Sequence, residues 1–153
     1  MSQPPLQNLI DEHADAVFRF LCALAGRQRA EDLFQKTFLS ALRAYPRLKD
    51  ASNLRAWLFR IAQHKVIDEH RRNARRPVPI AELPEAPTCG REEPDESLWQ
   101  ALDALPAKQR LAVLHRFVGD LTYRDVAGAL GISKEAARRN VHKRINKLRE
   151  VWS

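Results

Sequence analysis

Basic side chains gather on one side of the last patterned segment of this chain. Between residues 134 and 147 they lie opposite an apolar series, Ala137, Val141, Ile145 and Leu148, whose spacing of three or four residues predicts an amphipathic helix. Arginine can form two hydrogen bonds with a guanine edge, and lysine pairs with phosphates. This face therefore suits a DNA major groove, and its candidate contacts are Lys134, Arg138, Arg139, His142 and Lys143.

The residues before this helix have the features of a helix-turn-helix. Thr122 and Asp125 resemble a capping box for a short helix that ends at Leu130. Gly131 can adopt the left-handed conformation that a tight turn requires, and Ser133 can cap the basic helix. An ordinary helical hairpin with a solvated basic face is the alternative. The joint occurrence of caps, turn glycine and basic second helix favours DNA binding.

A second basic stripe is expected in the N-terminal half. Steps of three or four residues separate its members, which are Arg60, His64, Asp68, Arg71 and Arg75. Trp57 and Phe59 accompany the stripe, and cations beside aromatic rings can hold single-stranded nucleic acid. A place in the core is the alternative for Trp57. Asp68 is expected to orient Arg71 and Arg72 through i,i+3 and i,i+4 contacts.

The charged residues are distributed unevenly along the 153 residues, with an acidic stretch between two basic ones. Residues 1–76 carry 14 Lys and Arg against 8 Asp and Glu, residues 77–98 carry 1 against 6, and residues 99–153 carry 11 against 5, within a net charge of +7. Two segregated basic blocks indicate two surfaces for a polyanion. Five of the nine prolines lie between residues 77 and 94, so no helix should cross that stretch. We expect a flexible, Pro-rich acidic linker at 77–95.

Every long patterned segment has helical periodicity, which predicts an all-α protein with one small domain at 1–76 and another at 96–153. The expected helices span residues 6–25, 30–45, 53–76, 96–105, 106–119, 122–130 and 133–151. Domains of about 55–75 residues bury only roughly 60% of their unfolded surface, so each is marginal alone.

Several classes of function are excluded by the residues that would have to carry them. The five histidines are dispersed, and Cys22 and Cys89 lack a C-x-x-C spacing, so we expect no enzyme, metal or cofactor. The longest apolar run has six residues, far below the roughly 20 that span a bilayer, so we expect no membrane insertion. No secretory signal is visible, and a cytoplasmic location is expected.

Three spaced blocks resemble the extracytoplasmic-function (ECF) sigma factors of bacterial RNA polymerase. The first covers residues 30–38, the second residues 53–62 with Asp68 and Arg71, and the third residues 105–133. The resemblance implies a sigma region 2 helical bundle and a sigma region 4 helix-turn-helix. It also implies that the chain binds core polymerase and directs promoter-specific initiation of transcription.

The resemblance further implies which residues meet which partner. Docking on the clamp helices of the largest polymerase subunit would use Asp32, Leu33, Gln35, Phe38 and Leu39. Melting of the −10 element would use the loop at 46–52 and the side chains of Asn53, Arg55, Trp57, Arg60, His64 and Lys65. The basic helix would recognise the −35 element. The flap of the second-largest subunit and an anti-sigma factor are further expected partners.

Two other functions fit the same residues. A stand-alone helix-turn-helix repressor or activator would bind DNA without core polymerase. An adaptor would keep the docking helix and act through protein contacts alone.

Overall fold

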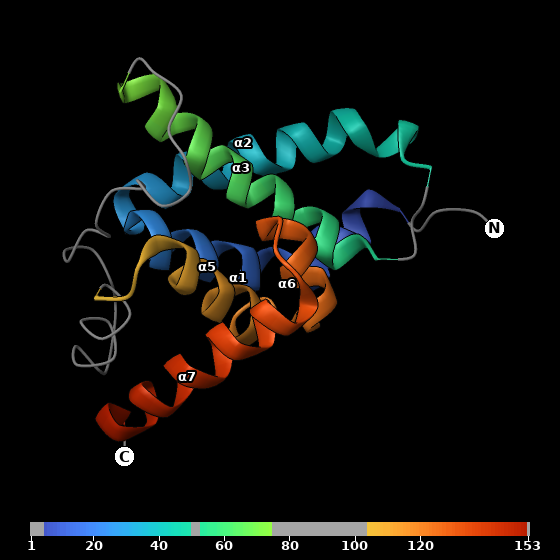
Figure 1. The fold of residues 1–153 in the computed structure, drawn as a ribbon. Coiled ribbons are helices and arrows are strands. Elements are labelled where there is room, and N and C mark those ends of the chain that lie inside the picture. The colour runs from blue at the N-terminus through green and yellow to red at the C-terminus, as the bar shows by residue number, and fades with distance from the viewer. Residues whose placement is uncertain (1–4, 50–52, 75–103, 153) are drawn as a thin grey trace.

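The computed structural model describes residues 5–49, 53–74 and 104–152, and regular structure in these residues is helical throughout (Figure 1). The elements are α1 (Leu6–Ala25), α2 (Arg27–Ala44), the 3-10 turn η1 (Tyr45–Arg47), α3 (Leu54–Ala74), α5 (Ala107–Phe117), α6 (Tyr123–Leu130) and α7 (Lys134–Trp152). The prediction of an all-helical chain is confirmed. None of these described helices is long and apolar enough to cross a membrane.

The predicted helix ends agree closely with those observed. Helix α2 begins at Arg27, three residues before the predicted start. Helix α3 begins after Asn53, whose Oδ1 accepts a hydrogen bond from the backbone N–H of Ala56 at 3.2 Å. The linker at 77–95 and most of the helix predicted at 96–105 lie outside the described residues. Leu105 is not helical, and α5 starts after Pro106.

The predicted helix-turn-helix signals are all present. Thr122 Oγ1 accepts a hydrogen bond from the N–H of Asp125 at 3.1 Å and caps α6. Ser133 Oγ accepts one from the N–H of Ala136 at 3.0 Å and caps α7. Gly131 between them has φ 68° and ψ 35°, the left-handed conformation that glycine adopts at little cost. These local bonds set the angle at which α7 leaves α6.

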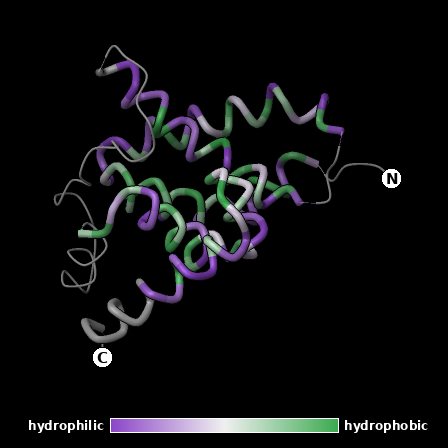
Figure 2. The backbone as a smooth tube through the Cα atoms, viewed as in Figure 1, coloured by the Kyte–Doolittle hydropathy of each residue, from purple (hydrophilic) through white to green (hydrophobic). Residues whose placement is uncertain are grey.

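The N-terminal and C-terminal helices pack against each other around one core, a contact that the sequence analysis did not predict. The ring of Phe20 in α1 lies 5.2 Å from that of Phe59 in α3 and 4.7 Å from that of His115 in α5. Figure 2 shows hydrophobic residues concentrated where α1, α3 and α5 meet. Two marginal helical groups gain apolar burial when they share a core.

Phe59 corrects one expectation about the basic stripe. Its side chain is fully buried in the shared core, so it offers no stacking surface to nucleic acid. The reason is its direction on α3, which faces α1 and α5.

Candidate nucleic-acid interface

The N-terminal half of α7 presents a basic face to solvent. Ala137 and Val141 are buried against the other helices and fix the orientation of α7 about its axis. All five residues predicted to contact the major groove are exposed, namely Lys134, Arg138, Arg139, His142 and Lys143. The structure therefore brings them together on one helix, on the side away from the core.

Two of these side chains contact a ring that the sequence analysis did not single out. The guanidinium carbon of Arg138 lies 5.6 Å from the centre of the Tyr123 ring, and the His142 ring lies 6.1 Å from it. Arg116 of α5 approaches the same ring at 5.2 Å. The position of Tyr123 directly after the cap Thr122 is the only sequence signal that points to this cluster.

The start of α3 is tied to the C-terminal helices. Asn53 Nδ2 donates a hydrogen bond to Asp125 Oδ1 at 2.9 Å, and Arg55 Nε donates to the carbonyl oxygen of Gly119. Asn53 is exposed, whereas Arg55 is half-buried. Two of the six residues predicted to contact the −10 element are therefore engaged within the chain.

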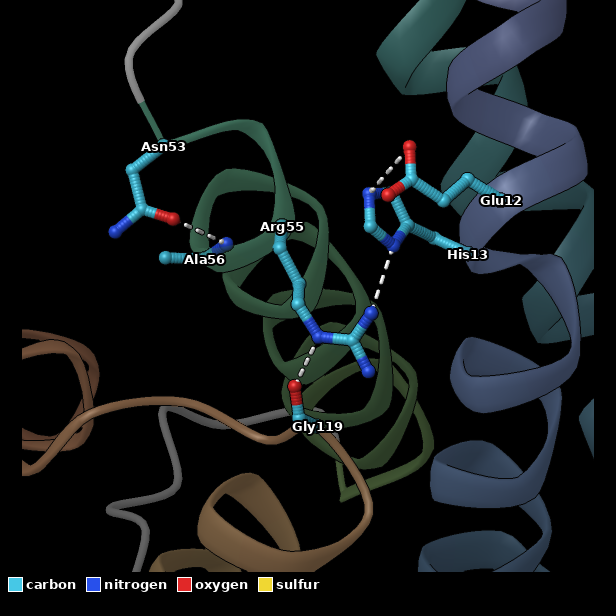
Figure 3. Close-up of polar contacts among 6 residues, drawn as sticks. All are labelled: Glu12, His13, Asn53, Arg55, Ala56 and Gly119. Carbon is cyan, nitrogen blue, oxygen red and sulfur yellow. Dashed lines mark hydrogen bonds and ion pairs between the residues drawn. The ribbon is translucent and has the colours of Figure 1, made fainter.

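Figure 3 shows Arg55 between Gly119 and His13 of α1. Arg55 Nη1 lies 2.8 Å from Nδ1 of His13. Because a guanidinium only donates, this nitrogen accepts, and the proton of the neutral ring is on Nε2, 3.9 Å from Glu12 Oε2. Burial lowers the pKa of His13, the Arg55 charge lowers it further, and Glu12 partly opposes them. Neutral His13 thus helps to hold Arg55.

The rest of the stripe on α3 has a mixed exposure. Arg60 and His64 are exposed one turn apart, and Lys65 is half-buried. Trp57 is also half-buried, with its ring 6.1 Å from that of Tyr45, so part of its surface belongs to the packing of α3 on η1.

The predicted pair of Asp68 and Arg71 is present. Asp68 Oδ1 lies 3.9 Å from Arg71 Nη1. Arg75 lies outside the described residues, and this end of the stripe is therefore described only as far as Arg71.

Helix α2 separates the five predicted docking residues into two sets. Leu33 and Phe38 are 1% and 9% exposed and belong to the core. Asp32 and Gln35 are exposed, and Leu39 is 51% exposed. Leu42, which the sequence analysis did not single out, is 56% exposed one turn further on. Leu39 and Leu42 together form an exposed apolar spot on α2.

A buried polar contact joins the two helical groups. Gln63 Nε2 donates to the carbonyl oxygen of Ala129 at 3.0 Å, and its Oε1 lies 2.6 Å from Nε2 of His115. Since Oε1 only accepts, His115 Nε2 carries the proton, and its Nδ1 has no hydrogen-bond partner among the described residues. Burial lowers the pKa of His115 to about 3, so this ring is neutral.

The described residues hold no group of three or more His, Cys, Asp or Glu side chains that could bind a metal ion. The chemistry that the exposed groups offer is instead that of hydrogen bonds and charge toward a polyanion.

Comparison with known proteins agrees with this geometry. The family model of sigma-70 region 2 matches residues 9–76, and that of sigma-70 region 4 matches residues 95–148. The ECF RNA polymerase sigma factor SigL of Mycobacterium tuberculosis is 33% identical over 155 residues, which cover 94% of this chain and 86% of the relative. SigE of Mycolicibacterium smegmatis is 30% identical over 162 residues, which cover 97% of this chain and 62% of the relative.

Solved structures show the same arrangement of helices. The sigma factor RpoE of Bartonella quintana, crystallised with the anti-sigma factor NepR, matches with a TM-score of 0.77 at 25% identity over 96% of both chains. CnrH, in complex with the cytosolic domain of CnrY, shares the fold with a TM-score of 0.68 at 24% identity, over 95% of this chain and 86% of CnrH. With both sigma-70 regions in order and a basic helix-turn-helix exposed, this chain belongs to the ECF sigma factors, which direct transcription initiation with RNA polymerase.

Proposed function

We propose that the chain recognises a promoter in two parts. A domain at 96–153 reads the −35 element, a domain at 1–76 melts the −10 element, and residues 77–95 link them. The observation that supports this proposal most directly is the exposed basic face of α7, on the side opposite buried Ala137 and Val141. Its base and phosphate contacts are Lys134, Arg138, Arg139, His142 and Lys143.

The −10 element is held by the side chains along α3. Exposed Arg60 and His64 support this assignment, because a guanidinium and a hydrogen-bonding ring on one side of a helix can follow a phosphate backbone. The full set comprises Asn53, Arg55, Trp57, Arg60, His64 and Lys65. Extruding a base from a duplex costs a few kcal/mol, which contacts of this kind must offset.

Two of these side chains already have hydrogen-bond partners within the chain. One N–H of Asn53 Nδ2 bonds to Asp125 and the Nε–H of Arg55 bonds to Gly119, so these two N–H groups cannot bond to a phosphate or a base at the same time. DNA contacts through these bonded N–H groups would require the junction to open, whereas contacts through the remaining N–H groups of Asn53 and Arg55 would not.

Core polymerase is engaged through α2. The clamp helices of the largest subunit contact its exposed side chains, Asp32, Gln35 and Leu39, and Leu42 extends this surface. Leu33 and Phe38 support the surface from the core. The flap of the second-largest subunit contacts the C-terminal domain. An anti-sigma factor is a further partner, which the co-crystal structure of the similar RpoE with NepR supports.

Run-off transcription tests the proposed function. Purified chain and bacterial core polymerase are given a library of duplex promoters, and transcripts should start from a subset that shares two spaced elements. DNA binding without core polymerase, together with no specific transcript, would instead support the stand-alone repressor or activator. If neither a specific transcript nor DNA binding is found, the result would support the adaptor that acts through protein contacts alone.

Leu39→Ala tests the docking surface. Leu39 is exposed, so its removal spares the core, unlike removal of Phe38. Loss of part of an interfacial leucine should cost about 1 kcal/mol, roughly fivefold in the Kd for core polymerase. Gln28→Ala, at an exposed position in the first turn of α2, is the matched control. Equal Kd values for the two variants would contradict the docking assignment.

A further inference from the structure

Tyr123 occupies a position from which it can act on the basic face of α7. It is the first residue of α6, directly after the cap Thr122, whose hydrogen bond to the N–H of Asp125 holds the start of the helix in place. Its side chain is half-buried and packs against the core. The ring therefore has a defined position.

Two side chains of α7 lie beside this ring. The guanidinium carbon of Arg138 lies 5.6 Å from its centre and the ring of His142 lies 6.1 Å away at an interplanar angle of 31°. Arg138 and His142 are one turn apart on α7 and both are exposed. Two side chains of the candidate DNA face, Arg138 and His142, thus share the Tyr123 ring as an aromatic support.

We infer that Tyr123 is a positioning residue for recognition of the −35 element, holding the guanidinium of Arg138 so that its planar fork can read a base edge. This inference rests on the proposed function of α7. It assigns to Tyr123 an indirect part in base specificity, exerted through Arg138.

The physical reason is the conformational freedom of arginine. An exposed arginine side chain samples many rotamers, and ordering it at an interface opposes binding. A guanidinium within about 6 Å of an aromatic ring is attracted to the face of the ring, so part of that ordering is complete before DNA arrives. Bidentate readout depends on the orientation of the fork, and therefore loses more than a phosphate contact when the support is removed.

Arg116 approaches the same ring but has other partners. Its Nη1 lies 3.6 Å from Asp120 Oδ1, and its guanidinium carbon lies 5.7 Å from the centre of the Phe117 ring. Arg116 is thus held on α5 by groups other than Tyr123. The contact that the described part of the chain gives the Arg138 side chain is the one with the Tyr123 ring, so Arg138 is the side chain that depends on this ring.

The test uses the full chain bound to core polymerase. A duplex library randomised upstream is first selected with the wild-type chain, and the recovered element is the probe. Binding is then measured on this duplex and on duplexes with each base pair changed, for Arg138→Ala, Tyr123→Leu, Tyr123→Phe and the double variant Tyr123→Leu with Arg138→Ala. Arg138→Ala should relax preference at one base pair.

Tyr123→Leu should relax preference at that same base pair by about threefold to tenfold, and Tyr123→Phe should keep it, because the ring and not the hydroxyl makes the contact. The double variant should resemble Arg138→Ala alone. The inference would be overturned if the double variant lost the summed preference of the two single variants, or if Tyr123→Leu weakened binding equally on every duplex. It would also be overturned if Tyr123→Phe relaxed the preference as much as Tyr123→Leu. The last of these would place the hydroxyl on a phosphate instead.

Failure of the inference is separable from failure of the proposed function. If the wild-type chain selects an element and Arg138→Ala relaxes it while Tyr123→Leu does not, only the inference fails. If the wild-type chain selects no upstream element, both fail. Because Tyr123 also packs on the core, far-UV circular dichroism and thermal melting of each variant accompany the binding data, and Tyr123→Phe provides a folded reference with the ring in place.

Discussion

Acidification should destabilise the contact between the two helical groups through His115. The ring is fully buried between Phe20 and Phe59, its Nε2–H is used by Gln63, and its Nδ1 is without a partner among the described residues. A proton on Nδ1 would place both a charge and an unpaired N–H in the core. Burial accordingly lowers the pKa of His115 from 6.5 to about 3.

The sign and size of the effect follow from this shift. Below pH 6.5 this histidine is protonated in the unfolded chain but stays neutral in the folded chain. The free energy of unfolding therefore falls as the pH falls from 6.5 toward 3. At about 1.4 kcal/mol per pH unit, the free energy of unfolding should drop by about 2 kcal/mol between pH 6.5 and pH 5. His13, whose pKa burial also lowers, acts in the same direction.

Urea denaturation followed by far-UV circular dichroism at pH 7 and pH 5 measures this loss. His115→Gln is the matched control, because a glutamine amide can still donate to Gln63 but does not titrate. The wild-type chain should lose about 2 kcal/mol more than the variant over this range, since His13 and the carboxylates are common to both. Equal losses, or a His115 ring resonance that titrates near pH 6.5, would refute the reasoning.

Three other perturbations probe the junction and the charge of the interface. Gly119→Ala would place a Cβ 2.6 Å from the carbonyl oxygen of His115, and overpacking of this kind should cost about 1–3 kcal/mol of stability. A Cβ at Gly128 meets nothing within 4 Å, so Gly128→Ala should stabilise α6. Equal melting temperatures for the two variants would contradict this prediction. Gln63→Ala should leave its buried partners unpaired and give a larger radius of gyration by small-angle scattering than the exposed control His64→Ala. An unchanged radius would show that this buried contact does not hold the two helical groups together. Promoter binding by the complex with core polymerase should weaken roughly 10³-fold or more between about 50 and 200 mM salt, and a flat salt dependence would exclude multiple phosphate contacts.

The sequence by itself determined the helices and the side of α7 that carries positive charge. Apolar residues recur every three or four positions, and the caps Thr122 and Ser133 and the turn at Gly131 act through bonds between residues close in the chain. Such signals are local, so they can be read without knowing how helices meet. The three blocks of resemblance identified the family for the same reason.

Only the tertiary structure decided which residues of a predicted set are exposed and which are buried. Leu33 and Leu39 are both predicted docking residues, yet one is buried and the other exposed, because α2 packs on α1 and α3 along one side only. The hydrogen bond of Arg55 to Gly119 and the approach of Tyr123 to Arg138 join residues from different elements of the fold. No periodicity within one helix encodes such contacts, since they depend on how separate apolar faces share a core.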